Sequence, residues 1–270
     1  VAVTGVQTCA LPIFQRRQSP GLTQTSQASV SFAPLQSLFG IVTPSGLHFE
    51  RHHQGWWDID PSKHRLMVNG SDEKMLKRSL VFTMDELMRL PSVSRFHFIE
   101  CGANTGMEWG NVAVPTVQYT HGMLSCSEFT GVRLIDVLQM CGFDARRARF
   151  VLAEGADGSS MTRTIPMALV TSGQVLLAYG QNGEMLRPEN GYPLRLVVPG
   201  YYGTYWVKHL SDITVMDKVF DGFWMSTAYR IPANACACTE PGKPAAKTVP
   251  IGRFNVRSFI TSLTDGAHVV

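Results

Sequence analysis

The stretch FHFIECGANTGMEWG, residues 96–110, joins an apolar run to a polar loop at a single cysteine, Cys101. Apolar residues alternate with others up to this cysteine, which is the pattern of a β-strand with one buried face. Small and polar residues, from Gly102 to Gly106, follow at once. The sequence therefore predicts a strand that ends in a thiol, with little side-chain bulk in front of it.

Two histidines stand near cysteines in this region, and their spacing suggests zinc ligands. His97 precedes Cys101, and His121 precedes Cys126. Residues four apart on a strand lie roughly 13 Å from each other, whereas zinc ligands lie about 2.0–2.3 Å from the metal. A zinc ion shared by His97 and Cys101 would therefore require a break in the strand. Taken alone, the run favours an ordinary buried thiol at Cys101.

Short strand-like runs recur along the chain and outnumber the predicted helices. A capping box formed by Thr83 and Glu86 opens one short helix. A second helix is predicted within residues 130–142, and the pair Asn182-Gly183 predicts a hairpin turn. Strands and crossover helices do not alternate, so the predicted fold class is α+β with mixed sheets.

The composition bounds the class of protein. The 270 residues are 44% hydrophobic and 17% charged, which is ordinary for a globular chain. The net charge of +3 comes without a long Lys/Arg cluster, so no nucleic-acid track is predicted. The sequence has no run of about 18 apolar residues, so no membrane span is predicted. It also has no C-x-x-C-H motif, so no attached haem is predicted in this chain.

Cys236 and Cys238 are interpreted as two thiols in a loop, because a disulfide over so short a ring would be strained.

Three segments are predicted along the chain. Residues 1–40 are interpreted as an artefactual or disordered N-terminal segment, since the first residues resemble translated vector sequence and the next are rich in Gln and Ser. Residues 41–239 form the predicted main domain. Residues 240–270 are interpreted as a linker rich in Pro, Gly and Lys, followed by the first strand of a truncated second domain.

Three basic clusters stand at predicted loop or strand ends. HFERHHQGWW holds Arg51 and His53, NGYPLRLVVPG holds Arg195, and GTYWVKHL holds Lys208. Each alone carries little weight, since most surface Arg and Lys side chains are solvated. Together they could hold a polyanion such as a cofactor phosphate. Asp157, in the loop AEGADG, could accept hydrogen bonds from a donor-rich ring.

Several blocks, in order along the chain, resemble the sulfite oxidase family of molybdenum enzymes, especially its bacterial sulfite dehydrogenase and sulfane dehydrogenase members. The blocks are HFERHH, HFIECGANTGMEW, AEGADG, LLAYGQNGEMLRPENGYPLRLVVPGYYG, VKHL, FWMSTAYRIP and RFNVRSFIT. The resemblance covers residue 43 to the C-terminus. It implies a sulfite-oxidase-type molybdopterin-binding catalytic domain over residues 41–239, followed by the start of an immunoglobulin-like β-sandwich dimerisation domain.

The resemblance also implies a role for each matching residue. Cys101 would ligate molybdenum, for which a soft thiolate is well suited. The implied catalytic residues are Arg51, Cys101, Trp224 and Tyr229, and the implied cofactor-binding residues are Phe49, Arg51, His53, Cys101, Asp157, Asn190, Arg195 and Lys208. No role is implied for His52 and His64, which are expected to be solvated.

The implied activity is the oxidation of sulfite to sulfate with a molybdenum–molybdopterin cofactor. Electrons would pass to a c-type cytochrome, the location would be the periplasm, and the full-length protein would be a homodimer. Related alternatives are a sulfane dehydrogenase that acts on protein-bound sulfur and a sulfoxide reductase. An alternative of another class is a zinc-stabilised or non-catalytic binding domain. Some family members carry His in place of Asn190, or arginines in place of Thr105 and Gly106, so the sequence indicates the cofactor better than the substrate.

Overall fold

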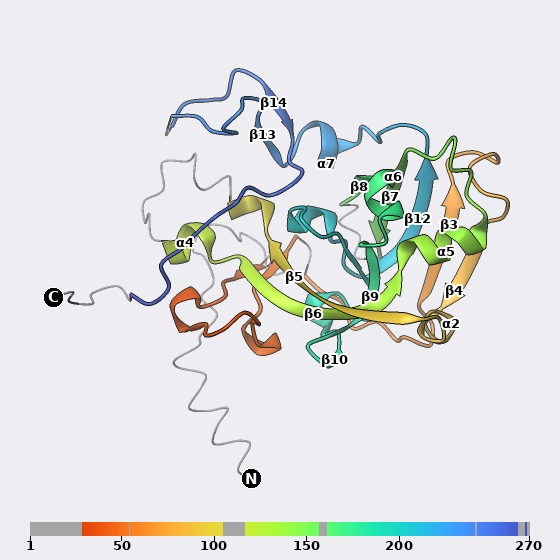
Figure 1. Cartoon of the computed structure of the whole chain (residues 1–270), viewed down its shortest axis with the longest axis horizontal. Helices are drawn as coiled ribbons and strands as arrows, with labels where there is room; N and C mark the ends of the chain where they lie inside the picture. Colours follow the sequence, from red (N-terminus) through yellow and green to blue (C-terminus); the bar gives the residue numbers. More distant parts are fainter. Residues whose placement is uncertain are drawn as a thin grey trace, which may run out of the picture.

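Two β-sheets of five strands each form the framework of the protein, seen here in a computed structural model (Figure 1). The structure describes residues 29–53, 55–104, 117–156, 161–240, 242–263 and 268. Short helices and turns connect the strands, and two small two-stranded sheets complete the described chain. The fold is α+β, which confirms the class predicted from the sequence.

The first large sheet is antiparallel and has the order β10-β9-β6-β5, with β11 paired to β9. Its strands are β5 (Ser92–Glu100), β6 (Leu124–Arg133), β9 (Leu176–Gln181), β10 (Glu184–Met185) and β11 (Arg195–Val197). Every residue of β5 pairs with β6, and the last pair joins Glu100 to Leu124. Cys101 therefore follows directly after the sheet ends, as the alternating run predicts.

The second large sheet is mixed and has the order β4-β3-β12-β7-β8. Its strands are β3 (Arg65–Gly70), β4 (Leu80–Thr83), β7 (Phe150–Gly155), β8 (Arg163–Pro166) and β12 (Leu210–Met216). β12 runs parallel to β3, whereas the other pairs are antiparallel. Leu66 and Val68 of β3 and Ile213 and Val215 of β12 are fully buried, so alternate residues of these two central strands enter the core.

β6 and β9 approach each other closely at Gly131. The pairing register shifts between Thr130 and Gly131, and a Cβ atom at Gly131 would lie only 2.1 Å from the carbonyl oxygen of Leu177. No other residue type leaves room for this contact.

The helices are short, and their ends follow local sequence signals. They are α2 (Met84–Met88), α4 (Val117–His121), α5 (Leu134–Cys141), α6 (Met167–Thr171) and α7 (Phe223–Ser226), with single three-ten turns η1 (Leu35–Ser37), η2 (Ser45–Leu47), η3 (Pro188–Asn190) and η4 (Gly203–Tyr205). The predicted capping box opens α2, since the Glu86 amide donates to Thr83 Oγ1 at 3.2 Å and the Thr83 amide donates to Glu86 Oε2 at 2.8 Å.

α5 buries one apolar face and ends where the sequence predicts. Val137 and Leu138 are fully buried, and Gly142 ends the helix in the left-handed region with a φ of 69°. The helix starts later than expected, because residues 130–133 continue β6 and pair with β9. Sheet pairing thus outweighs helical periodicity over these four positions.

The predicted hairpin at Asn182-Gly183 joins β9 to β10.

The folded part begins earlier than the sequence suggests. β1 (Ser29–Ser31) pairs with β2 (Glu50–His52), and Val30 lies opposite Arg51. Phe32 and Ala33 are buried in the common core. The fold thus includes residues from Ser29 onward, whereas the composition of this segment placed the start at residue 41.

The C-terminal segment packs against the main domain. β13 (Arg230–Pro232) pairs with β14 (Thr248–Pro250), which lies inside the segment interpreted as a linker. Ile251 is 1% exposed and belongs to the common core. The strand expected after the linker does not form among the described residues 253–263; an isolated bridge joins Arg253 to Tyr201. The immunoglobulin-like domain stays a prediction.

The loop between β13 and β14 corrects the interpretation of the close cysteine pair. Cys236 and Cys238 form a disulfide. Ala237 between them has a positive φ of 48°, and Asn234 Oδ1 accepts a hydrogen bond from the Cys238 amide at 3.1 Å. This tight turn brings the two sulfur atoms together, which the sequence pattern alone did not indicate.

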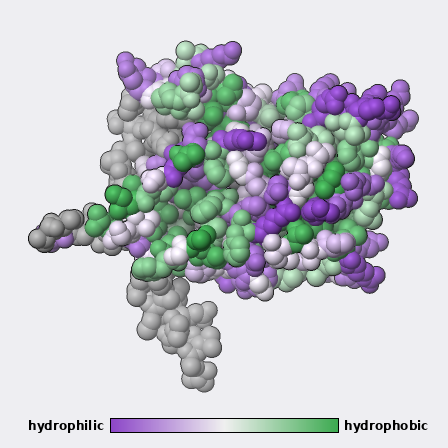
Figure 2. Space-filling model, viewed as in Figure 1, coloured by the Kyte–Doolittle hydropathy of each residue, from purple (hydrophilic) through white to green (hydrophobic). Residues whose placement is uncertain are grey.

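Hydrophobic and hydrophilic residues are interspersed over the face seen in Figure 2, and hydrophilic residues are dense at the end that holds β3 and β4. β5 is an edge strand, and its Phe96 and Phe98 side chains are 58% and 52% exposed. Within the part of the chain that the structure describes, no helix combines the length and apolar character needed to cross a membrane.

Candidate active site

A cleft with about 790 Å³ of empty space, part of it open to solvent, lies between β2, the end of β5 and the loops that flank η3 and η4. The residues that line it are His48, Phe49, Glu50, Arg51, His52, His53, Gly55, Ile99, Cys101, Met161, Glu189, Asn190, Arg195, Gly203, Thr204, Trp206, Val207, Lys208 and Tyr229. The lining joins segments that are far apart in the sequence. It also carries more fixed positive than negative charge.

Cys101 lies in the wall of this cleft and is 5% exposed. Its amide donates to the Met123 carbonyl at 3.0 Å, and its own carbonyl accepts from the Asn104 amide at 3.1 Å. Desolvation raises the pKa of the Cys101 thiol, whereas the nearby charges of Arg51 and Lys208 act in the opposite direction. The backbone thus holds the thiol in place. A cation bound beside the sulfur atom would favour the thiolate form of Cys101.

The small residues around Cys101 are required by close packing. A Cβ atom on Gly102 would lie 3.1 Å from Tyr229 Cδ1 and 3.2 Å from Thr204 Cγ2. A Cβ atom on Gly203 would lie 3.1 Å from the Glu100 carbonyl oxygen. These contacts are tighter than ordinary van der Waals distances, so a larger residue at either position would push the cleft wall inward.

Arg51, His53 and Tyr229 form a chain of hydrogen bonds along one wall. Arg51 Nη2 lies 3.4 Å from His53 Nδ1, and His53 Nε2 lies 2.9 Å from Tyr229 Oη. Because Arg51 can only donate, His53 Nδ1 accepts, and the neutral ring then carries its proton on Nε2. Arg51 Nη1 also donates to the His52 carbonyl. The chain places a permanent cation and a hydroxyl group on the same side of the cleft.

Three aromatic rings meet at this wall. The His53 ring lies 5.1 Å from the Trp224 ring and 6.1 Å from the Tyr229 ring, and Trp224 lies 6.0 Å from Tyr229 between centroids. Tyr229 has a φ of 52°, a left-handed conformation that is uncommon for a bulky residue. Desolvation raises the pKa of Tyr229, so its hydroxyl stays protonated. Tyr229 is therefore fixed as a hydrogen-bonding group that faces the cleft.

His52 is buried, not solvated. Its Nδ1 accepts from Lys208 Nζ at 2.8 Å, and its Nε2 lies 3.1 Å from Glu50 Oε2. Lys208 Nζ also donates to the carbonyls of Arg51 at 3.3 Å and Glu189 at 3.1 Å. Desolvation, with the charges of Lys208 and Arg51, lowers the pKa of His52 from 6.5 to about 3. The close approach of Glu50 is consequently a hydrogen bond to a neutral imidazole rather than an ion pair.

Arg195 is a buried cation in the lining of the cleft. Its Nη1 donates to the Asn190 carbonyl at 2.9 Å, and its Nη2 donates to the Trp206 carbonyl at 3.3 Å. Its guanidinium carbon lies 5.8 Å from the Trp206 ring centroid. Desolvation lowers the pKa of Arg195 to about 10, so it remains charged at neutral pH.

A further buried cation lies behind Tyr229. Arg163 is fully buried, and its guanidinium carbon lies 5.6 Å from the Tyr229 ring and 5.0 Å from the Tyr205 ring. Its Nη1 contacts Met225 Sδ at 3.3 Å. Desolvation lowers the pKa of Arg163. Its charge adds to the positive potential on the Tyr229 side of the cleft, which favours an anion there.

A protein-family model described as oxidoreductase molybdopterin binding domain matches residues 53–224. The chain belongs to this family. Its relatives include a nitrate reductase [NADH] of Volvox carteri, which is 34% identical over 69% of this chain and 22% of that protein. They also include the mitochondrial sulfite oxidase of Drosophila melanogaster, which is 32% identical over 82% of this chain and 43% of that protein. The chain therefore spans less than half the length of these curated relatives.

A solved structure supports the same fold. The sulfane dehydrogenase SoxCD from Paracoccus pantotrophus superimposes with a TM-score of 0.77 and is 38% identical, over 83% of this chain and 56% of that one. The chain thus shares its family with sulfite oxidases and nitrate reductases.

The cleft fits the cofactor that this family implies. Asn190 Oδ1, Arg195 Nε and Thr204 Oγ1 are buried and have no hydrogen-bond partner among the residues that the structure describes. A buried donor or acceptor without a partner costs about 1–3 kcal/mol, so a polar ligand that pairs with these atoms would be held firmly. A pterin ring with a phosphate offers such groups, and the Cys101 thiolate is a soft ligand for molybdenum. Molybdenum–molybdopterin would thus be held between Cys101 and the cations Arg195 and Lys208.

The structure brings together nearly all residues singled out from the sequence. Phe49, Arg51, His53, Cys101, Asn190, Arg195, Lys208 and Tyr229 line the cleft. Trp224 does not line the cleft, but its ring contacts the rings of His53 and Tyr229. Asp157 lies outside the described residues.

Sequence reasoning missed the burial of several polar residues, one of which lines the cleft. His52 and His64 were expected in solvent, but they are 1% and 6% exposed, and His64 Nε2 bonds to the Leu210 carbonyl at 2.9 Å. The polar run HFERHH gave no signal that His52 is buried. Arg163 lies in a strand whose composition gave no sign of a buried charge. Within the described residues, no three His, Cys, Asp or Glu side chains gather as a metal site of their own.

Proposed function

We propose that this chain is the catalytic unit of an enzyme that oxidises sulfite to sulfate. The observation that carries the proposal is the convergence of the Cys101 thiol, the Arg51–His53–Tyr229 chain and the cations Arg195 and Lys208 on one cleft. An anion with several oxygen atoms matches this arrangement, because arginine binds oxyanions through its planar fork.

The protein groups have distinct tasks in this reaction. When bound, the cofactor supplies the oxygen-transfer and two-electron chemistry. Arg51 attracts and orients the sulfite anion. Tyr229 Oη donates to a substrate oxygen and stabilises the charge that develops there, while His53 fixes the direction of that hydroxyl. Sulfite and water give sulfate, two protons and two electrons, and the electrons leave one at a time to a c-type cytochrome.

A second candidate is the oxidation of a sulfane sulfur carried by a protein partner. The 38% identity to the sulfane dehydrogenase SoxCD favours it. The exposed aromatic residue Phe223, next to Trp224, offers a contact for such a carrier. Reduction of sulfoxides, with oxygen moving in the opposite direction, is a third reaction that the same cofactor could support.

The location and assembly of the enzyme complete the proposal. A periplasmic location is supported by the Cys236–Cys238 disulfide, because disulfides persist in oxidising compartments. We propose that the full-length protein is a homodimer and that its electron acceptor is a separate cytochrome. The mildly basic character of the chain, with a net charge of +3, is compatible with docking to an acidic partner.

The test combines metal analysis with a cytochrome c reduction assay on one preparation from a host that makes the cofactor. Sulfite, a sulfane-sulfur carrier and methionine sulfoxide are compared as substrates. Cys101→Ser is the test variant, and Cys126→Ser is the matched control, because Cys126 is also buried but does not line the cleft.

The proposal predicts stoichiometric molybdenum, sulfite-dependent reduction in the wild type and in Cys126→Ser, and loss of both in Cys101→Ser. Molybdenum with reduction by the sulfane substrate alone would replace sulfite by the second candidate. Full activity in Cys101→Ser would overturn the assignment of the metal ligand.

A further inference from the structure

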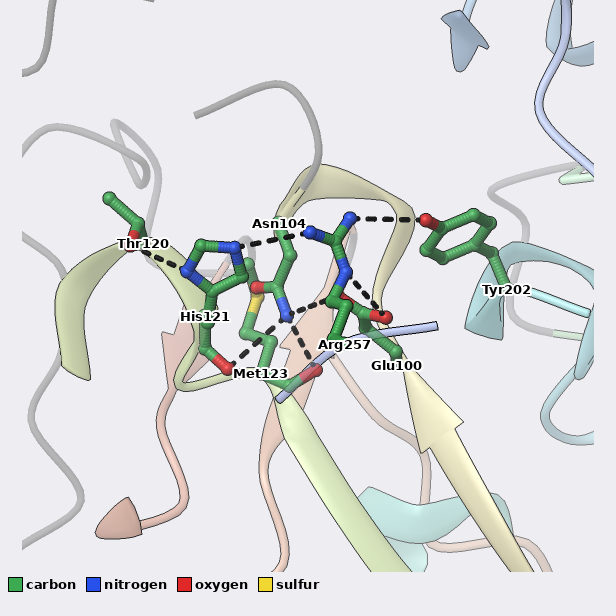
Figure 3. Close-up of polar contacts among 7 residues, drawn as sticks. All are labelled: Glu100, Asn104, Thr120, His121, Met123, Tyr202 and Arg257. Carbon is green, nitrogen blue, oxygen red and sulfur yellow. Dashed lines mark hydrogen bonds and ion pairs between the residues drawn. The ribbon is translucent and has the colours of Figure 1, made fainter. Parts of the chain in front are cut away.

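Glu100 and Arg257 form an ion pair at the end of β5 (Figure 3). Glu100 precedes Cys101 and is only 2% exposed. Arg257 Nε lies 3.0 Å from Glu100 Oε1 and 3.3 Å from Glu100 Oε2. Neither residue lines the cleft, so the cofactor contacts described above do not explain this pair.

Arg257 links Glu100 to two other parts of the fold. Its Nη2 donates to Tyr202 Oη at 3.2 Å, and its Nη1 donates to His121 Nε2 at 3.3 Å. His121 Nδ1 then donates to Thr120 Oγ1 at 2.7 Å. Figure 3 shows the guanidinium group pointing between these partners. Its donors are thus directed to groups on β5, α4 and the loop before η4.

Asn104 supports the same carboxylate from the other side. Its side chain is fully buried, and Nδ2 lies 3.3 Å from Glu100 Oε1, 3.3 Å from the His121 carbonyl and 3.2 Å from the Met123 carbonyl. Asn104 also donates its amide to the Cys101 carbonyl. The turn that carries the thiol is therefore bonded to Glu100 through both its backbone and a side chain.

The segment that carries Arg257 is fixed along its length. The Ile251 amide donates to the Tyr229 carbonyl at 2.8 Å, and the Phe254 amide donates to the Gly200 carbonyl at 3.1 Å. The Ile251 side chain is buried, and its Cδ1 atom would lie 3.3 Å from a Cβ atom on Gly102. We call residues 251–257 the strap. It crosses behind both Tyr229 and the Cys101 turn.

We propose that Glu100 and Arg257 are positioning residues, and that the strap fixes the Cys101 turn so that its thiol is held ready for the metal. The inference rests on the proposed role of Cys101 as the ligand. A carboxylate taken out of water needs a partner of opposite charge. Loss of Arg257 would remove this partner from the buried Glu100 carboxylate, and the turn would open to hydrate it.

The test is hydrogen–deuterium exchange of the full chain, with molybdenum content measured on the same samples. The variants are Arg257→Gln, Arg257→Lys, Glu100→Gln and the double variant Glu100→Gln/Arg257→Gln. The matched control is Arg253→Gln, because Arg253 belongs to the same strap but its side chain is exposed. The peptides that cover residues 99–104 report on the turn, and those that cover β3 and β12 report on global stability.

We expect exchange in 99–104 to rise about tenfold or more in Arg257→Gln, since one buried charge loses its partner. The rise should be smaller in Arg257→Lys, which keeps the charge, and in the double variant, which removes both charges. Molybdenum content should fall in the same order, while β3 and β12 exchange as in the control.

The outcomes separate this inference from the proposed function. Exchange in 99–104 equal to that of Arg253→Gln would overturn the positioning role. An equal rise in β3 and β12 would do so too, because it would show a global loss of stability. Faster exchange in 99–104 without molybdenum in any sample, wild type included, would uphold the structural role of the pair and refute the role of Cys101 as ligand.

Discussion

The buried pair of His52 and Lys208 predicts how the stability of the protein depends on pH. Lys208 Nζ donates to His52 Nδ1 at 2.8 Å, so a second proton on the ring would break this bond and place two cations side by side. Burial, assisted by Lys208 and Arg51, lowers the pKa of His52 from 6.5 to about 3. The folded state thus holds His52 neutral, whereas the unfolded chain protonates it below its ordinary pKa.

The magnitude follows from linkage between protonation and folding. Between pH 6.5 and pH 3 the unfolded state binds one more proton at His52 than the folded state does, so the free energy of unfolding falls as the pH falls. Each pH unit in this window is worth about 1.4 kcal/mol. From neutral pH to about pH 5, His52 should therefore remove about 2 kcal/mol of stability.

Urea unfolding of the cofactor-free chain, followed by tryptophan fluorescence, measures this loss at neutral pH and near pH 5. His52→Gln keeps a polar group of similar length but does not titrate. Its loss of stability over this interval should be about 2 kcal/mol smaller than that of the wild type. His64 and His97, whose pKa values burial also lowers, titrate in both proteins and cancel in the difference. Equal losses in the two proteins would refute the buried neutral state of His52.

Three more predictions follow from contacts described above. Thr83→Ala removes the capping box of α2 and should cost about 1 kcal/mol of unfolding free energy; an unchanged urea midpoint would contradict this. Leu138→Ala leaves a cavity under α5 and should cost about 3 kcal/mol, whereas Met140→Ala, on the exposed side of the same helix, should cost little; similar losses would contradict the packing argument. Tyr229→Phe removes the hydroxyl that bonds to His53 and should lower kcat for sulfite about tenfold at unchanged molybdenum content; an unaffected kcat would exclude the hydroxyl from the reaction.

Local patterns in the sequence predicted the elements whose causes are local. The capping box at Thr83, the glycine that ends α5 and the hairpin at Asn182-Gly183 all formed where expected. Elements whose limits depend on partners far away in the sequence were placed less well. Residues 130–133 joined a strand because β9 lies beside them, and β1 formed because β2 offers it an edge.

The candidate site shows the same division. Motif resemblance singled out Cys101, Arg51 and Tyr229 because each stands in a distinctive block. The partners that fix these groups, such as His52 and Arg257, stand in blocks of the same kind, but the sequence indicated no role for them. Only their burial and their contacts identify them.

The distance along the chain between the walls of the cleft has a consequence for how the enzyme matures. His53 and Tyr229, which share a hydrogen bond, are 176 positions apart, and the strap behind them lies later still. During synthesis, the ribosome releases β2 and Cys101 long before Tyr229 and Ile251 exist. A cofactor that needs all of these groups cannot be captured by the growing chain. Its insertion therefore has to wait until the chain has been synthesised through the strap.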